Sequence, residues 1–467
     1  MQDLPSRPYR RGTCPGVGSS MSTGDGLLSR VRVPGGRLQA KHLAFISTLA
    51  AQHGQAVLEL TRRGNLQLRG LAPETDASVS AALIAQGLAV APAEAEASRN
   101  TLSSPAADLD PYALADPWPL ALALDKAMVK DTAFRALPTK FRLLLNGGGV
   151  AHLAAEDADI RADAIMSPDG LRYRLSVAGT AYSSKRLGLC APEHTVKALL
   201  ALTHHFIERN SALPTRGRRL LHVLGEVPLH EFQAVVAPWL QPSDTPFATN
   251  PSLGPDPGTV IGAQNGWFGA GVPFGELSAE TAQALADLAE THAAGQLRLT
   301  PWRQILLPGA GAELAGALNS LGLITEPDDA RLSATACPGA PACNSGSSST
   351  RTDALGWARA VPALFDGELT IHISGCGKGC AHPLTNPLTL TARAGLYDLI
   401  VNDRADPAHE VNTVLTGLTP ADVEARLQLL SRILHKARQA DETLSQLIMR
   451  LDARLLRQAL LADASVA

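Results

Sequence analysis

The sequence predicts an α+β fold that is duplicated within one chain, with two small half-domains that pair with each other and two larger mixed domains. Three observations support this prediction. Two distant stretches of sequence are closely similar, a fainter second pair of similar stretches accompanies them, and the 467 residues are 45% hydrophobic and 18% charged, with 40 Gly and 32 Pro. That composition is typical of a soluble, loop-rich globular enzyme, and the length suggests about three domains.

The first pair of similar stretches covers residues 33–61 and 272–300, which align without a gap and share 11 of 29 positions. Each copy predicts a strand, a glycine turn, an amphipathic helix and an alternating strand that ends in a basic loop. In the first copy the helical spacing is carried by Leu43, Ile46 and Leu49. This order of elements is half of a ferredoxin-like sandwich, so the two copies are expected to pair about a pseudo-twofold axis.

The second pair of similar stretches is "FRLLLNGGG" (141–149) and "LTIHISGCG" (369–377). In each copy a strand leads into a glycine turn, a second strand follows downstream, and only the later copy carries cysteines. The predicted domains are a first half-domain (1–72), a mixed domain without cysteines (99–215), a second half-domain (216–312) and a cysteine-bearing domain that ends in two helices (328–467).

Charge and hydropathy exclude several classes of protein. The formal net charge is −3, so the molecule as a whole has no field that favours nucleic acid or a membrane surface. The N-terminus has no apolar signal region, and no stretch approaches the roughly 18 apolar residues of a membrane span. The sequence therefore predicts a cytoplasmic protein, in which any anion-binding site must be a local cluster of Arg and Lys.

Four of the six cysteines form two tight pairs, in "CPGAPACNSG" (337–346) and "SGCGKGC" (374–380). Small buried cysteines are one alternative, and structural zinc is another, although zinc ribbons favour two-residue spacers. A [4Fe–4S] cluster accepts wider spacing, and the neighbouring glycines allow backbone amides to point toward its sulfides. Cys14 and Cys190 have no partner at ligand spacing and are expected to be structural. The predicted cluster ligands are Cys337, Cys343, Cys376 and Cys380.

The spacing C-x5-C followed by C-x3-C, on a chain with two ferredoxin-like halves, resembles the sirohaem-dependent sulfite and nitrite reductase superfamily over nearly the whole chain. The resemblance implies two α/β domains of the sulfite reductase type, the second with a [4Fe–4S] cluster. It implies that Cys380 takes the position that bridges cluster and sirohaem iron in those reductases. It also implies a basic site for a carboxylate-rich tetrapyrrole. The matching positions are Arg63, Arg99, Lys140, Arg142 and, by pseudo-symmetry, Arg303.

Several positions depart from the reductase pattern. Thr139 stands where the reductases have an arginine that contacts sirohaem, and Gly377 and Lys378 replace Pro and Asn between the last two cysteines. With "TGDGLL" (23–28) and "LTPWRQILLPG", these features resemble the precorrin-3B synthase family of aerobic cobalamin (vitamin B12) biosynthesis. That resemblance implies a monooxygenase that hydroxylates precorrin-3A with O2 at the meso carbon between rings A and D and forms a γ-lactone. It implies a mononuclear non-haem iron in addition to the cluster, and NADH as the ultimate electron donor.

Some assignments stay open at the level of sequence. No G-x-G-x-x-G frame is visible, so electrons are expected from a separate reductase or a ferredoxin. His152, His372 and His382 show no facial-triad pattern and are expected to be structural or at the surface, and no catalytic residue is assigned. Two alternatives remain: a sirohaem-dependent sulfite or nitrite reductase, and a non-catalytic electron-transfer or tetrapyrrole-carrier protein.

Overall fold

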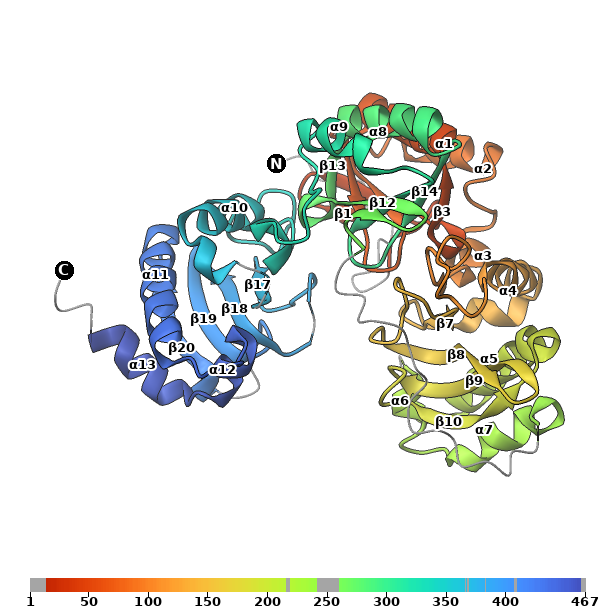
Figure 1. The fold of residues 1–467 in the computed structure, drawn as a ribbon. Helices are drawn as coiled ribbons and strands as arrows, with labels where there is room; N and C mark the ends of the chain where they lie inside the picture. Colours follow the sequence, from red (N-terminus) through yellow and green to blue (C-terminus); the bar gives the residue numbers. More distant parts are fainter. Residues whose placement is uncertain are drawn as a thin grey trace. The chain divides into compact units, whose positions relative to one another are not determined.

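The computed structural model describes residues 14–215, 219–241, 260–365, 367, 369–382, 384–406 and 410–462 (Figure 1). The chain divides into two compact units. The first comprises residues 1–22, 26–270 and 275–322, and the second residues 23–25, 271–274 and 323–467. The outer ends of the predicted domains, at 1–13, 216–218 and 463–467, lie outside the described residues. Within the described residues, no helix has the length and hydropathy of a membrane span.

The two similar stretches form two five-stranded sheets. The first sheet consists, in spatial order, of β1 (Met21–Thr23), β2 (Gly26–Val31), β5 (Leu66–Leu71), β4 (Val57–Leu60) and β13 (Glu276–Ser278). The second consists of β11 (Gly262–Gln264), β12 (Trp267–Gly271), β15 (Gln304–Pro308), β14 (Gln296–Leu299) and β3 (Arg37–Gln39). The helices of this part are α1 (Ala40–His53), α2 (Asp76–Ala85), α3 (Ala93–Ser98), α8 (Ala279–His292) and α9 (Ala315–Ser320).

Each of these two sheets takes its last strand from the other copy of the repeat. β13 pairs antiparallel with β4, where Leu277 lies opposite Leu58, and β3 pairs with β14, where Leu38 lies opposite Leu297. The register is therefore the same at both exchanged strands. Helices α1 and α8 pack against each other (Figure 1), and the predicted apolar stripe of α1 is buried. The structure confirms the predicted duplicated α+β fold.

The third sheet also belongs to the first unit. In spatial order it consists of β10 (Lys185–Cys190), β9 (Gly170–Gly179), β8 (Ala158–Ser167), β7 (Leu143–Asn146) and β6 (Thr101–Ser103). Strands β6, β7 and β8 are parallel, and β9 and β10 continue the sheet antiparallel. Its helices are α4 (Trp118–Lys130), α5 (Pro192–Ala212), α6 (Leu220–Val223) and α7 (Leu229–Val236) (Figure 1).

The boundary predicted at residue 216 differs from the structure. Helices α6 and α7 follow that boundary, yet Leu220, Val223 and Phe232 are buried in the same apolar core as Phe206 of α5. The apolar face of these short helices packs on α5 and on the third sheet because burying it there removes it from water. The second half-domain begins, among the described residues, only at 260–262, with β11.

The fourth sheet belongs to the second unit and repeats the topology of the third. In spatial order it consists of β16 (Ala334–Ala336), β17 (Ile371–Ser374), β18 (Asn386–Arg393), β19 (Leu396–Asp403) and β20 (Thr413–Leu418). Three parallel strands are again followed by two antiparallel ones. Its helices are α10 (Thr350–Ala360), α11 (Pro420–Ala437), α12 (Leu444–Arg450) and α13 (Ala453–Ala462).

The C-terminal segment forms three helices in the described residues where two were predicted. Helix α11 ends before Arg438, and a new helix begins at Thr443, whose side chain accepts from the Gln446 amide while Gln446 caps the Thr443 amide. This capping box satisfies amides that would otherwise lack partners at a helix start. The capping box of this polar stretch therefore starts a third helix, which the spacing of apolar residues alone did not predict.

Candidate functional site

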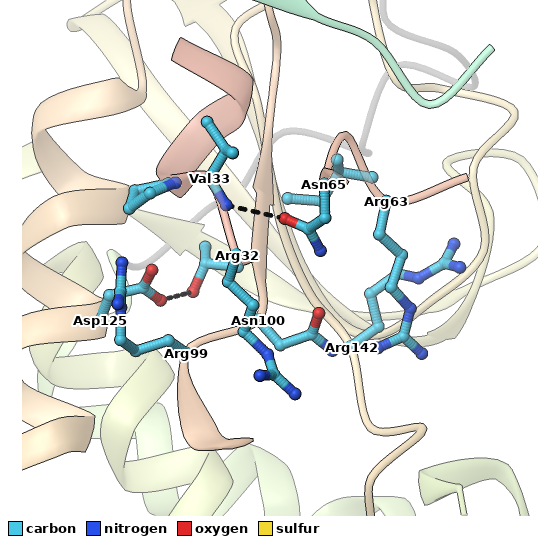
Figure 2. A pocket seen from close by; sticks show the side chains of 11 residues that line it. Arg32, Val33, Arg63, Asn65, Arg99, Asn100, Asp125 and Arg142 are labelled. Carbon is cyan, nitrogen blue, oxygen red and sulfur yellow. Dashed lines mark hydrogen bonds between the residues drawn. The ribbon is translucent and has the colours of Figure 1, made fainter. Parts of the chain in front are cut away.

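A hollow in the first unit gathers arginines from several segments (Figure 2). We call it the basic pocket and define it by the polar side chains that line it. Its volume, open solvent included, is about 270 Å³. That is below the roughly 300–1,000 Å³ of pockets that enclose drug-sized ligands. The polar lining residues are Arg32, Arg63, Asn65, Arg99, Asn100, Thr101, Asp125 and Arg142.

Two lining residues come from the first ferredoxin-like copy. Arg32 follows β2, and Arg63 lies in the turn between β4 and β5. The Thr61 hydroxyl accepts from the amides of Arg63 (3.3 Å) and Asn65 (3.2 Å), and Asn65 Oδ1 accepts from the Val33 amide at 2.9 Å. These bonds fix the turn that carries Arg63 to the segment that carries Arg32.

Two further arginines come from the segments around the third sheet. Arg99 donates to Glu96 at 2.7 Å, and Arg142 donates to the Asp157 carbonyl at 2.7 Å and to Glu156 at 3.3 Å. Glu96 is fully buried, and burial raises its pKa although Arg99 and Arg32 oppose that shift.

Arg32 is the least satisfied cation in the basic pocket. It is 7% exposed and lies 3.6 Å from Glu96, but its Nε and Nη1 have no hydrogen-bond partner among the described residues. Nearby, burial and the positive charge of Arg142 lower the pKa of Arg63 to about 9. Both observations indicate an excess of buried positive charge, which an anion would offset.

Asp125 adds an acid to the same pocket. Its carboxylate accepts from the Thr101 hydroxyl at 2.6 Å. A dashed line at Asp125 in Figure 2 marks this hydrogen bond. Burial raises the pKa of Asp125 to about 6, against the hydrogen bond from Thr101 and the charge of Arg99. Asp125 therefore exchanges a proton close to neutral pH.

The structure brings together three of the five predicted basic residues: Arg63, Arg99 and Arg142. Lys140 contributes its backbone carbonyl, which accepts from Arg63 Nη2 at 3.0 Å, while its side chain is exposed. Arg303 does not line the pocket. It occupies the β14–β15 turn with φ 62°, the position equivalent to Gly64, and its stem packs against Gly275.

Arg30 and Arg32 were not predicted from the sequence as residues of the site. Arg30 lies on β2, where it donates to Gln67 Oε1 at 2.7 and 3.1 Å. The signal that could have found them is the alternation in "SRVRV", which places both arginines on one face of an extended segment.

The four predicted cluster ligands lie on two loops of the second unit that are bonded to each other. The Ser347 amide donates to the Gly375 carbonyl at 3.1 Å, and Lys378 Nζ donates to Ser345 Oγ at 2.7 Å. Burial raises the pKa of Cys380, and so do the charges of Cys376, Cys337 and Cys343. The four thiols are therefore near enough to interact electrostatically.

Glycines shape the first cysteine loop. Gly339 has φ 67°, and its carbonyl accepts from the Cys343 amide at 2.8 Å. The Gly375 amide donates to Cys337 Sγ at 3.2 Å. A backbone donor of this kind stabilises negative charge on a ligand sulfur. Among the glycines beside the cysteines, Gly339 and Gly379 have positive φ, whereas Gly375 and Gly377 do not.

The "TGDGLL" turn packs on this loop. The Gly24 amide donates to the Ala342 carbonyl at 3.2 Å, and a Cβ at Gly24 would lie 2.1 Å from the Pro341 carbonyl oxygen. Only glycine allows this close approach of two backbones.

The four cysteines remain the predicted ligands of a [4Fe–4S] cluster. Within the described residues, no three His, Cys, Asp or Glu side chains converge closely enough to bind one metal ion. A cubane needs one thiolate at each of its four irons, which are separate atoms, so its ligands stand further apart than those of one ion. His372 is fully buried with its ring 5.8 Å from that of His382, and His152 is buried in the first unit.

The two remaining cysteines have different surroundings. Cys190 is buried in the core of the third sheet, and burial raises its pKa, which suits a structural role. Burial opposes ionisation of Cys14 as well, but Arg30 and Arg63, with a hydrogen bond from Thr139, lower its pKa overall.

Comparisons with known proteins agree with the fold and with each other. The family model for the nitrite/sulfite reductase ferredoxin-like half domain matches residues 20–86 and 262–321. A precorrin-3B synthase of Sinorhizobium sp is 31% identical over 458 residues, which cover 95% of this chain and 93% of that protein. A ferredoxin–nitrite reductase of Synechococcus elongatus is 29% identical over 382 residues, 76% of this chain and 74% of its own. The solved structure of Mycobacterium tuberculosis NirA superposes with a TM-score of 0.73 at 18% identity, covering 92% of this chain and 84% of that one.

Proposed function

Because the chain belongs to the precorrin-3B synthase family, we propose that it hydroxylates precorrin-3A with O2 in aerobic cobalamin biosynthesis. The hydroxyl group enters at the meso carbon between rings A and D, and a ring-A acetate closes the γ-lactone. In this monooxygenase reaction one oxygen atom of O2 enters the product, and the other leaves as water with two electrons and two protons.

The basic pocket is the observation that carries this proposal. A precorrin has acetate and propionate arms, and a carboxylate on such an arm can accept from Arg32 Nε and Nη1, which lack partners among the described residues. The volume of about 270 Å³ suits one carboxylate arm, not the ring. We therefore assign the pocket to a peripheral carboxylate of the substrate, held by Arg32, Arg63, Arg99 and Arg142.

Cys337, Cys343, Cys376 and Cys380 would hold a [4Fe–4S] cluster, which supplies electrons one at a time when bound. The protein's own contribution there is to orient the thiolates through the bonded loops and to stabilise negative charge on sulfur with the Gly375 amide. Electrons are proposed to come from NADH through a separate reductase or a ferredoxin. No described residues form a site for a mononuclear iron, so we derive no step through one.

Asp125 and Glu96 set the charge of the basic pocket. Glu96 neutralises part of the charge of Arg99 and Arg32 from a fully buried position. Asp125, with a pKa of about 6, takes up or releases a proton as an anionic arm enters or leaves. These residues keep the pocket selective for carboxylates without leaving four uncompensated cations in the empty state.

The alternative is a sirohaem-dependent sulfite or nitrite reductase, since nitrite reductases are relatives at 29% identity or less. Two positions favour the synthase. Thr139 takes the place of a sirohaem-contacting arginine and bonds to Cys14, and Lys378 ties the two cysteine loops together through Ser345. A non-catalytic carrier of electrons or tetrapyrroles is the third candidate, and turnover of precorrin-3A in the test below would exclude it.

The test is to purify the protein anaerobically, record its absorption spectrum and then supply precorrin-3A, reductant and O2. We expect broad cluster absorption without sirohaem bands, and the hydroxylactone by mass spectrometry. Sirohaem bands, or no hydroxylactone from protein with an intact cluster, would overturn the proposal.

A matched pair of variants tests the basic pocket. Arg63→Gln removes a pocket donor, and a hydrogen bond to a charged group is worth about 1.5–3 kcal/mol, so tetrapyrrole binding should weaken roughly 10- to 100-fold. Arg135→Gln, at an exposed position outside the pocket, should bind as the wild type does. Equal affinities of the two variants would argue against the pocket.

A further inference from the structure

Arg142, the pocket arginine just before β7, is held by the segment that leads into β8. Its Nη1 donates to the Asp157 carbonyl at 2.7 Å and to Glu156 at 3.3 Å. Its backbone is fixed by Asp159, whose carboxylate accepts from the Arg142 amide at 2.9 Å and whose amide donates to the Arg142 carbonyl at 3.0 Å. The side chain and the backbone of Arg142 therefore both depend on residues 156–159.

Arg219 fixes this segment from a distant part of the chain, just before α6. Its Nε donates to the two carboxylate oxygens of Asp159 at 2.9 and 2.8 Å, and its Nη2 donates to Asp157 Oδ2 at 2.6 Å. The Leu220 amide also donates to Asp159, at 2.7 Å. Asp159 is 1% exposed, and a carboxylate buried to this degree needs a charged partner. Asp159 thus joins Arg219 on one side to the backbone of Arg142 on the other.

Arg219 can influence a ligand in the basic pocket through this connection. It does not itself line the pocket, whereas Arg142 does. Two other pocket arginines, Arg63 and Arg99, donate to acceptors outside residues 156–159. A loss of Arg219 should therefore affect the position of one pocket arginine more than that of the others.

We propose that Arg219 is a positioning residue for Arg142: it holds residues 156–159, and these residues present the Arg142 guanidinium to a carboxylate of the substrate. A side chain that is already held in place loses less conformational freedom when its ligand binds, so binding is tighter. The nature of the ligand rests on the proposed function, but the connection between the two arginines does not.

A double-mutant cycle tests the proposal. Binding of precorrin-3A is measured anaerobically and without reductant, so that no turnover occurs, in the wild type, Arg219→Gln, Arg142→Gln and the double variant. Arg219→Gln should weaken binding roughly three- to tenfold, the factor that corresponds to immobilising one long side chain on binding. In the Arg142→Gln background the same change should weaken binding less than about twofold. An equal loss in both backgrounds would overturn the proposal, because a general loosening of the unit acts on every pocket residue.

Two further variants separate this role from the loss of any ion pair. Arg219→Lys keeps the charge and should recover part of the affinity. Arg209→Gln breaks an ion pair of 2.7 Å with Glu231 elsewhere in the same unit and should bind as the wild type does. If Arg209→Gln lost as much affinity as Arg219→Gln, the positioning role would be refuted.

Hydrogen exchange of the ligand-free protein tests the connection without a tetrapyrrole. The peptide that contains the Arg142 amide should exchange faster in Arg219→Gln and as in the wild type in Arg209→Gln. If Arg219→Gln does not fold, Asp157→Asn replaces it, because this change at a 44% exposed side chain removes one contact of Arg219 and leaves Asp159 paired. Unchanged exchange would overturn the proposal. Failure of the wild type to bind precorrin-3A would overturn the proposed function, and the exchange rates would still decide whether Arg219 holds Arg142.

Discussion

Replacing Gly339 by alanine tests whether one backbone position sets the geometry of the first cysteine loop. Gly339 has φ 67°, a conformation that costs an alanine about 1–2 kcal/mol. The new Cβ would also lie 2.2 Å from the Ser348 carbonyl oxygen and 2.9 Å from the Thr350 amide nitrogen. Neither atom belongs to a flexible side chain, so the loop itself must move.

The expected loss of stability follows from these two contributions. Overpacking a close contact typically adds about 1–3 kcal/mol, so Gly339→Ala should cost roughly 2–5 kcal/mol in total. At about 2–4 °C per kcal/mol, the melting temperature should fall by roughly 4–20 °C. The Gly339 carbonyl accepts from the Cys343 amide, so the shift should also displace a proposed ligand and reduce bound iron.

Gly417→Ala is the matched control. Gly417 lies in the same unit with φ 70°, but no atom lies within 4 Å of its Cβ position. It should therefore show only the conformational cost, a fall of a few °C, and full iron content. Calorimetry and iron analysis of both anaerobically purified variants measure the difference. If the two variants melt together and hold equal iron, the steric argument for Gly339 is wrong.

Three further predictions follow from buried charges and from the cysteines. Asp163→Asn should cost about 3–5 kcal/mol in denaturant unfolding, because it leaves Arg161, 0% exposed, without its ion pair. Burial alone would raise the pKa of Asp163, but Arg161 and Arg174 hold that pKa below its ordinary value. The cost of Asp163→Asn should therefore persist above about pH 4 and shrink in more acidic solution, where Asp163 of the wild type becomes protonated. Burial raises the pKa of Asp125 to about 6, so folding opposes ionisation of this carboxyl group. As the pH rises from about 4 to 7, the wild type should therefore lose up to about 3 kcal/mol of unfolding free energy relative to Asp125→Asn. Denaturant unfolding of both proteins across this pH range measures the difference, and a constant difference would contradict the prediction. Cys380→Ser should abolish cluster absorption and turnover, whereas Cys190→Ser should retain both, and iron retained by the former would contradict the ligand assignment.

The fold was largely predictable because the two copies of the repeat are still similar in sequence. Eleven identities in 29 positions identify two equivalent copies, and the spacing of Leu43 and Ile46 predicts the buried face of the first helix. The boundary at 216 was wrong because the packing of Leu220 on the preceding core is a tertiary contact that leaves no local pattern.

The candidate site was predictable only in part. Arg63, Arg99 and Arg142 were identified by motif, but whether they meet depends on how separate sheets pack. Arg303 was expected in the basic pocket because the two copies of the repeat are related by pseudo-symmetry. The residue equivalent to Arg63 is, however, Trp302, so the arginine of the second copy lies one position later in the turn than Arg63 does in the first. Arg32 was missed because nothing in a strand sequence shows that a guanidinium will lack partners.

The exchanged strands β3 and β13 have a consequence for how such a chain can arise. One copy on its own would lack the strand that pairs with β4, so that edge of its sheet would be open. The unpaired amides and carbonyls of an open edge can bind a strand of another chain. Its nearest complement is a second identical copy, since the register at both exchanged strands is the same. A single-copy ancestor would thus have been a homodimer whose stability fell on dilution. Joining the copies in one chain removes that dependence on concentration and frees each half to diverge, so that one copy can carry Arg63 where the other carries Trp302.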